Sequence, residues 1–293
     1  MDAIVCSHLT KFYGKARGIE DVCLTVSQGE FFGFIGPNGA GKSTTIRTLL
    51  GLIRPTSGTG TVLGMDIGTD REKILKKVGY LPAEAAFYPG MRVRDVLKLS
   101  ADLRGRDCRE SADELCQRLR LDPSRKVEEL SLGNRKKAAI VCALQHDPEL
   151  LILDEPTSGL DPLIQREFFE ILRQRSEAGT TVFLSSHILS EIQRNCTRAA
   201  IIRAGKIIAC DRVESLSQTG ARRVTVHGEI DISGLAGVKD LQESPGVLRF
   251  LYHGDLNKLV SVLAKGNIRD LAVSEPDLEE VFLHYYEEGG EEK

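Results

Sequence analysis

Residues 36–44 combine glycines, a lysine and hydroxyl side chains at a spacing that suits phosphate chemistry. The segment matches the pattern G-x-x-x-x-G-K-[ST] and contains Gly36, Pro37, Asn38, Gly39, Ala40, Gly41, Lys42, Ser43 and Thr44. Glycines in such a loop allow backbone N–H groups to close around phosphate oxygens at the positive end of a helix. We expect Lys42 to contact the β- and γ-phosphates and the Ser43 hydroxyl to bind Mg²⁺. The pattern therefore predicts a nucleoside triphosphate site.

Two carboxylates follow a continuous apolar run at residues 150–153. Asp154 and Glu155 come directly after this run. A strand that is apolar on both faces is typical of a covered parallel sheet, and such sheets bind ligands at the carboxyl ends of their strands. We expect Asp154 to hold Mg²⁺ directly or through water, and Glu155 to orient the attacking water. The pattern alone is weakly specific, and its place downstream of a phosphate loop makes it informative.

A third candidate element is the run Leu130-Ser131-Leu132-Gly133-Asn134, which precedes a helical pattern. Ser131 and the backbone around Gly133 predict a second anion-binding helix N-terminus. Without context, the same run would fit an ordinary capped helix. We interpret the basic cluster at residues 135–137 as the solvated start of this helix and not as a nucleic-acid surface.

Composition and charge exclude several classes of protein. The chain has 293 residues, which allows one or two domains, and its 39 Lys and Arg against 42 Asp and Glu provide no overall basic field for nucleic acid. Aromatic residues make up 5%, with no Trp, which argues against an extensive base-stacking surface. The seven cysteines are odd in number and lack a C-x-x-C pair, so we expect reduced thiols in a cytosolic protein.

Hydropathy gives no sign of a membrane-spanning segment. No run approaches the roughly 18–20 apolar residues that cross a bilayer. The N-terminus has neither the basic nor the apolar region of a signal peptide. We expect no direct membrane insertion, so that any membrane role requires a partner.

Element patterns predict an α/β fold. Apolar or β-branched runs alternate with helical stretches up to about residue 215, and they predict strands at 3–9, 23–26, 31–35, 150–153, 181–185, 199–203 and 206–210. A helix is expected at 45–50, and Ala204-Gly205 is expected to form a tight turn.

Two further regions differ in pattern. Residues 86–147 have helical periodicity, with one helix at 92–103 and another opened by a capping-box pattern at 111–114. After residue 215 the chain predicts strands at 222–227, 247–251 and 268–273, helices at 255–264 and 277–286, and an acidic tail at 287–293.

At this point residues 1–215 resemble the nucleotide-binding subunits of ATP-binding-cassette (ABC) transporters. Five motifs occur in order: Walker A at 36–43, the signature at 130–134, Walker B at 150–154, the D-loop at 158–161, and the H-loop histidine at 187. The resemblance implies a P-loop NTPase with a RecA-like parallel core sheet, an N-terminal antiparallel β-subdomain and a helical signature subdomain at about 86–147. A small C-terminal α+β domain would occupy residues 216–293.

The same resemblance implies roles for individual residues. Two subunits, here a homodimer, would pack head to tail around ATP and Mg²⁺, with Ser131, Gly133 and Asn134 facing the partner's nucleotide. Glu155 would be the general base, His187 would contact the γ-phosphate, and Asp161 would couple the two sites. Tyr13 would stack on adenine; otherwise it is a solvated turn residue.

Two departures from the family pattern stand out. Ala83 occupies the position where the family usually has the Q-loop glutamine, and we expect either Glu84 or solvent to fill that metal position. The signature has Leu132 and Asn134 where glycine and glutamine are common. Leu132 is acceptable if its φ is negative.

The C-terminal run at 275–282 resembles the ATPase subunits of bacterial exporters for drugs, antibiotics, peptides, lipids or sodium, although a generic amphipathic helix would give a similar pattern. The resulting hypothesis is an ATPase at the cytoplasmic face of a membrane that energises export through a separate integral-membrane permease. One alternative is a soluble ABC ATPase that acts on ribosomes or DNA. The other is a regulatory nucleotide-binding module that does not turn over.

Overall fold

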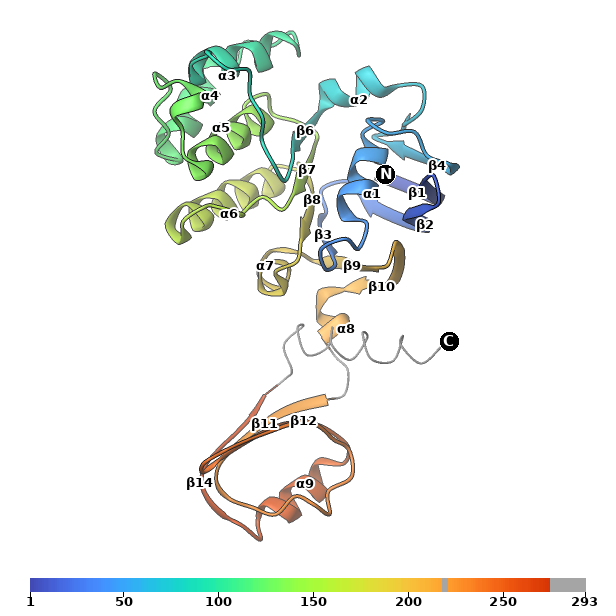
Figure 1. Ribbon diagram of the computed structural model, residues 1–293, viewed down its shortest axis with the longest axis vertical. Coiled ribbons are helices and arrows are strands. Elements are labelled where there is room, and N and C mark those ends of the chain that lie inside the picture. The colour runs from blue at the N-terminus through green and yellow to red at the C-terminus, as the bar shows by residue number, and fades with distance from the viewer. Residues whose placement is uncertain (218–220, 275–293) are drawn as a thin grey trace. The chain divides into compact units, whose positions relative to one another are not determined.

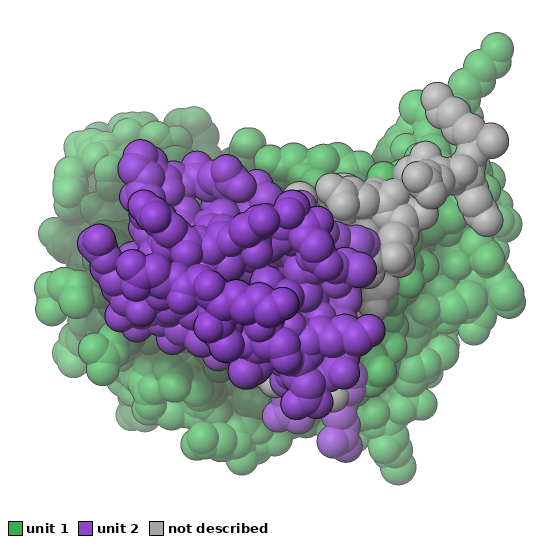
Figure 2. Space-filling view, turned by 90° about the horizontal axis from the view of Figure 1, so that it is seen from below, with its two compact units in different colours: residues 1–211 green, residues 212–293 purple. Residues whose placement is uncertain are grey.

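The chain forms two compact units in the computed structural model, which describes residues 1–217 and 221–274 (Figure 1). The first unit comprises Met1–Asp211 and the second Arg212–Lys293 (Figure 2). The predicted domain boundary, at residue 215, lies close to this division.

A six-stranded sheet forms the centre of the first unit. Its strand order is β10-β9-β3-β8-β7-β6, and the neighbours from β9 to β6 pair in parallel. The strands are β3 (Phe31–Ile35), β6 (Val78–Leu81), β7 (Leu150–Asp154), β8 (Thr181–Ser186), β9 (Arg198–Arg203) and β10 (Lys206–Arg212). Every residue of β3, β7 and β8 is buried, as expected for a parallel sheet covered on both faces. The segments that follow these three strands therefore meet at one edge of the sheet.

An antiparallel sheet packs beside this centre. Its order is β2-β1-β4-β5, with β1 (Asp2–Tyr13), β2 (Ala16–Ser27), β4 (Ser57–Val62) and β5 (Met65–Asp66). β1 and β2 are longer than predicted, because bulges in their pairing interrupt the alternation of buried and exposed residues.

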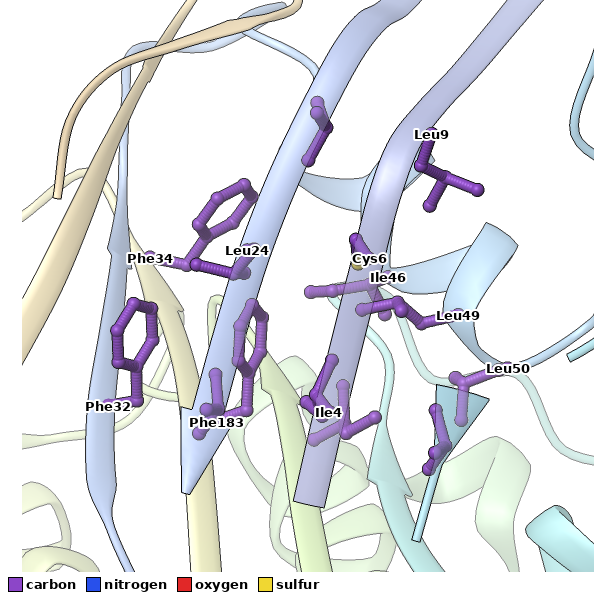
Figure 3. Packing of buried hydrophobic residues seen from close by; sticks show 14 of the residues in the cluster. Ile4, Cys6, Leu9, Leu24, Phe32, Phe34, Ile46, Leu49, Leu50 and Phe183 are labelled. Carbon is purple, nitrogen blue, oxygen red and sulfur yellow. The ribbon is translucent and has the colours of Figure 1, made fainter. Parts of the chain in front are cut away.

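Helix α1 (Lys42–Leu49) joins the two sheets into one hydrophobic core. It contacts β2, β4 and β7. Figure 3 shows Ile46 and Leu49 of α1 beside Ile4 of β1, and Phe32 and Phe183 of the central sheet. The rings of Phe32 and Phe183 stack with centroids 5.8 Å apart. The phosphate loop thus connects a buried strand to a buried helix.

The remaining helices of the first unit lie on the other side of the central sheet or beside β6 (Figure 1). They are α2 (Arg71–Lys77), α3 (Val93–Asp102), α4 (Arg109–Arg118), the 3₁₀ turn η1 (Val127–Glu129), α5 (Leu132–Leu144), α6 (Pro162–Glu177) and α7 (Leu189–Asn195). The predicted capping box at residues 111–114 is wrong. Helix α4 begins at Arg109, and the Ser111 hydroxyl is buried inside its first turn without a hydrogen-bond partner among the described residues.

Among the described residues, the second unit has a four-stranded antiparallel sheet that packs against helix α9 (Leu256–Leu263). The order is β12-β13-β11-β14, and the elements are α8 (Val213–Ser217), β11 (Ala221–Glu229), β12 (Val238–Ser244), β13 (Val247–His253), α9 (Leu256–Leu263) and β14 (Asn267–Ser274). Val224, Phe250 and Tyr252 pack against Leu259 and Leu263 of α9. The predicted helix at 277–286, the exporter-like run at 275–282 and the acidic tail lie outside the described residues.

The α/β prediction, with a parallel core sheet and an antiparallel β-subdomain, is confirmed. Among the described residues, no helix combines the length and apolar character needed to cross a membrane.

Candidate nucleotide-binding and catalytic site

The phosphate loop runs from the end of β3 to the start of α1. Gly39 and Gly41 have φ values of 80° and 111°, a region that favours glycine. A Cβ at Gly41 would stand 2.9 Å from the backbone oxygen of Gly18, so space as well as conformation requires glycine there. No side chain caps the start of α1. Its first N–H groups are therefore directed at the loop, as an anion-binding helix start requires.

Lys42 is the buried cation of this loop. Its side chain is only 6% exposed, and Nζ donates to the carbonyl oxygens of Gly36 at 2.5 Å and Pro37 at 3.2 Å. The same Nζ lies 3.0 Å from Oε1 of Glu155, an ion pair whose alignment does not meet hydrogen-bond geometry. The structure thus brings the predicted phosphate ligand and the predicted general base into contact.

Asp154 ends β7 with a fully buried carboxylate. Its Oδ1 accepts a hydrogen bond from the Ser185 hydroxyl at 2.7 Å, while Oδ2 has no partner among the described residues. A buried, unsatisfied carboxylate oxygen is costly unless a ligand completes it. A hard cation or its bound water would do so, and the residues present therefore fit Mg²⁺.

Ser185 was not predicted as a site residue. Besides holding Asp154, it accepts the backbone N–H of Glu155 at its carbonyl oxygen, at 3.2 Å. A serine at the carboxyl end of an otherwise apolar buried strand is the sequence signal that would have identified it.

Glu155 and His187 form the second pair of the site. Oε2 of Glu155 lies 2.6 Å from Nδ1 of His187, and because an ionised carboxylate only accepts hydrogen bonds, Nδ1 donates. Glu155 has a φ of 48°, an uncommon conformation for a residue with a side chain. It is mostly buried, whereas His187 is 46% exposed at the end of β8. The chain thus holds the carboxylate between a buried cation and an exposed imidazole.

Tyr13 lies near the end of the phosphate loop. The ring is 48% exposed, and Lys11 Nζ is 5.4 Å from its centroid. A Cβ at Gly18 would stand about 3 Å from both the Tyr13 ring and the Thr44 side chain, so these two groups flank the same glycine. The position suits an aromatic platform beside the loop.

The signature residues begin α5 and contact the D-loop. The Ser131 hydroxyl caps α5 by accepting the N–H of Asn134 at 3.3 Å. A Cβ at Gly133 would stand 2.7 Å from the carbonyl oxygen of Gly159, so the two loops pack closely. Leu132 is 69% exposed and, as an α-helical residue, has negative φ. Asp161 caps α6 by accepting the N–H groups of Leu163 and Ile164.

The structure does not join these elements to the phosphate loop. Within the described ranges, no hydrogen bond or ion pair links Ser131, Asn134 or Asp161 to residues 36–44. Glu84 is exposed, in contrast to the fully buried Asp154.

The prediction that the basic cluster at residues 135–137 is solvated is wrong for two of its members. Lys136 is 3% exposed and Lys137 is also buried. Lys136 Nζ donates to the carbonyl oxygens of Pro82 at 3.0 Å and Ala83 at 2.9 Å. The missed signal is the spacing of Lys136, Ile140 and Leu144, which places the lysine on the buried face of α5.

Comparisons with known proteins agree on one family. Residues 19–158 match the family described as ABC transporter. The uncharacterized ABC transporter ATP-binding protein YhaQ of Bacillus subtilis (strain 168) is 33% identical over 292 residues, which cover 96% of this chain and 97% of YhaQ. The bacitracin transport ATP-binding protein BcrA of Bacillus licheniformis is 35% identical over 300 residues, which cover 96% of each chain. A solved structure of an ATP-binding subunit of an ABC transporter is similar with a TM-score of 0.70 and 30% identity, covering 74% of this chain and 92% of that one.

Proposed function

Because the chain belongs to the ATP-binding proteins of ABC transporters, we propose that it is the ATPase subunit of an exporter for drug- or antibiotic-like compounds. Similarity to BcrA over nearly the whole of both chains supports export of this class of compound. The observation that supports hydrolysis most directly is the contact of Glu155 with both Lys42 and His187. These contacts fix the carboxylate beside the phosphate loop, where it could accept a proton from water once ATP has displaced it from Lys42.

The proposed roles follow from these contacts. Lys42 and the backbone N–H groups of residues 38–44 bind the phosphates, while Ser43 and Asp154 hold Mg²⁺, with Glu84 as a further ligand. When bound, the ion would neutralise charge on the phosphate oxygens. ATP would take over Lys42 from Glu155, because the phosphates carry more negative charge than one carboxylate. Glu155 would then be free to act as general base, with His187 next to it as the γ-phosphate contact. Tyr13 would carry the adenine.

The second half of each site would come from another copy of this chain. Ser131 is exposed and Gly133 and Asn134 are half-buried at the start of α5, and Asp161 lies in the adjoining loop. Both halves of a composite site are present in one sequence, which favours a head-to-tail homodimer. A separate integral-membrane permease would bind this dimer at the cytoplasmic face of the membrane.

The alternatives have less support. A ribosome- or DNA-directed ATPase would be expected to expose basic residues, whereas two of the three cations at 135–137 are buried. A module without turnover would be expected to lack the general base, whereas Glu155 and His187 are present and paired.

The deciding experiment compares ATP hydrolysis by the full chain and by Glu155→Gln, with the oligomeric state followed by light scattering. We expect the turnover of Glu155→Gln to fall about 10²–10³-fold, because the general base is lost. Since the variant still binds ATP but hydrolyses it slowly, its ATP-bound dimer should accumulate. Glu149→Gln, at the other end of β7 in an exposed ion pair with Lys77, is the matched control and should behave like the unmodified chain.

Turnover of Glu155→Gln within about threefold of the unmodified protein would contradict the assigned base. For the transporter assignment, purification in mild detergent from the native membrane should recover the chain with an integral-membrane protein. Recovery of the chain with ribosomes or DNA would instead support the first alternative.

A further inference from the structure

Lys136 connects two parts of the first unit that belong to different sequence motifs: the signature helix α5 and the segment after β6. It lies in the first turns of α5, a few residues after the signature, and α5 packs against β6. Pro82 and Ala83 follow directly after β6, and their carbonyl oxygens both accept hydrogen bonds from Nζ of Lys136. One ammonium group thus ties the signature helix to the segment that leaves the central sheet.

Burial of the Lys136 ammonium is energetically unfavourable. An ammonium removed from water loses several kcal/mol of hydration, and an apolar side chain of similar volume would fill the space without that loss. Desolvation lowers the pKa of Lys136 to about 8, and the negative charges of Asp154 and Glu155 oppose this lowering. The ammonium therefore lies within electrostatic reach of the two carboxylates of the candidate catalytic site.

The tie acts through the backbone of residue 83. The Ala83 side chain is a methyl group and offers no hydrogen bond, whereas its carbonyl oxygen accepts one at 2.9 Å. Lys137, the next residue of the same helix, is also buried but makes no hydrogen bond to this segment among the described residues. Lys136 and Lys137 are thus both buried, but of the two only Lys136 makes a specific connection to the segment after β6 among the described residues.

We propose that Lys136 is a positioning residue that holds the signature helix in register with the segment after β6 and with the carboxylates at the end of β7. It acts through its hydrogen bonds to the carbonyl oxygens of Pro82 and Ala83. Its function is to keep the start of α5 at a fixed place relative to Asp154 and Glu155. Movement of the 82–84 segment is then passed to the signature helix through this ammonium.

The test uses Lys136→Met in the full chain, because methionine keeps the volume and removes the charge and its donors. We expect the kcat of ATP hydrolysis to fall about tenfold while KM for ATP stays within about threefold, since the phosphate loop is intact and only alignment is lost. Lys136→Arg, which restores charge and donors, should recover most of the turnover. Lys137→Met is the matched control and should leave both constants within about twofold.

Hydrogen–deuterium exchange of the nucleotide-free proteins supplies a readout that does not depend on activity. In Lys136→Met, amides of residues 83–88 and 132–136 should exchange about tenfold faster, while those of β7 stay protected. In Lys136→Gln, which keeps one donor group, the exchange rates should lie between those of the unmodified protein and those of Lys136→Met. This variant replaces Lys136→Met if the methionine variant does not fold.

Three results would overturn the proposal. One is unchanged exchange at residues 83–88 in Lys136→Met. Another is an equal loss of turnover in Lys137→Met, which would show only that buried basic residues stabilise α5. The third is a failure of Lys136→Arg to recover turnover although it folds, which would assign the effect to side-chain shape instead of to the charged tie.

Discussion

The phosphate loop and the signature run at residues 130–134 both lead into helix N-termini, yet the side chains around them differ in charge and burial. At the phosphate-loop edge, Lys42, Glu155 and His187 are linked to one another. At the start of α5, Ser131 and Leu132 face solvent, and the capping bond from Asn134 to Ser131 is internal to the turn. The charged side chains Lys42, Glu155 and His187 of the first region contact one another, whereas the second region exposes an uncharged turn to solvent.

This difference bears on the state of the proposed composite site in the absence of ATP. Buried charges without a partner are unfavourable, and Lys42, Glu155 and His187 contact one another. Under the proposed function, phosphate would replace the contact between Lys42 and Glu155. The signature turn is neutral and exposed, and it needs no such protection. Under the proposed function, ATP would bind at the phosphate-loop edge first, and contact with the signature turn of a second copy would follow.

The largest effect expected from breaking this contrast comes from Lys42→Ala. The change removes the phosphate ligand and leaves Glu155 buried beside His187 alone. We expect ATP affinity to fall about 100-fold or more, which is about 2.7 kcal/mol, because the phosphates lose a buried cationic hydrogen-bond donor. Isothermal titration measures this, with the exposed Lys73→Ala as control. Unchanged affinity would mean that residues 36–44 do not bind the phosphates.

Gly133→Val should affect only the signature side. Its Cβ would collide with the Gly159 carbonyl oxygen, 2.7 Å away, and displace the D-loop. We expect about a 30-fold loss of turnover and of the ATP-dependent dimer, with ATP binding by the monomer retained. Equilibrium binding together with light scattering would separate the two effects. Gly234→Ala, which places its Cβ in open space, is the control, and a loss of ATP binding in Gly133→Val would contradict the division between the regions.

The C-terminal end of α5 is followed by a buried histidine, whereas its N-terminal end is exposed. His146 is buried just beyond Leu144, and its Nε2 accepts a hydrogen bond from Arg104 at 3.1 Å. Desolvation, followed by the charge of Arg104, lowers its pKa to about 4. Between pH 6.5 and 4 the unfolded chain binds the proton more readily, so the free energy of unfolding falls as the pH falls through this window.

From pH 7 to pH 5 the contribution of His146 to this loss should be about 2 kcal/mol. Urea unfolding at the two pH values measures it. His146→Gln, which still accepts from Arg104, should remove that part of the pH dependence. Identical pH dependence in His146→Gln and the unmodified chain would contradict the assignment.

The smallest effect is expected at Ala83, between the two regions. Ala83→Gln adds the amide that the family usually has, but the backbone of residue 83 is already held by Lys136. We expect turnover to change less than about threefold, with Ala86→Gln as the neighbouring control. A rise above about tenfold would instead identify Ala83 as the feature that limits metal coordination.

Local patterns were sufficient to predict much of the fold. The strands β3, β7 and β8 were predicted nearly to the residue, because each is a short, largely apolar run of strand-like length, which is typical of a strand in a covered parallel sheet. The strands β4, β5, β6 and β12 were not predicted, since glycines, threonines and exposed charges give them no clear alternation. The cap at Ser111 failed because burial of Leu115 and Cys116 decides where α4 packs, and its start follows from that packing.

For the candidate site, the sequence alone determined which residues are chemically equipped: a glycine loop with Lys42, the carboxylates at 154 and 155, and the motif order that identifies the family. These depend on residue type and on short spacing along the chain. The tertiary structure decided which groups meet, namely Lys42 with Glu155, Asp154 with Ser185, and Lys136 with the carbonyl oxygens after β6. Each of these contacts joins residues from 31 to 113 positions apart. No local preference encodes them, because they arise only when buried strands bring their carboxyl ends to one edge and the helix beside β6 buries its own cation.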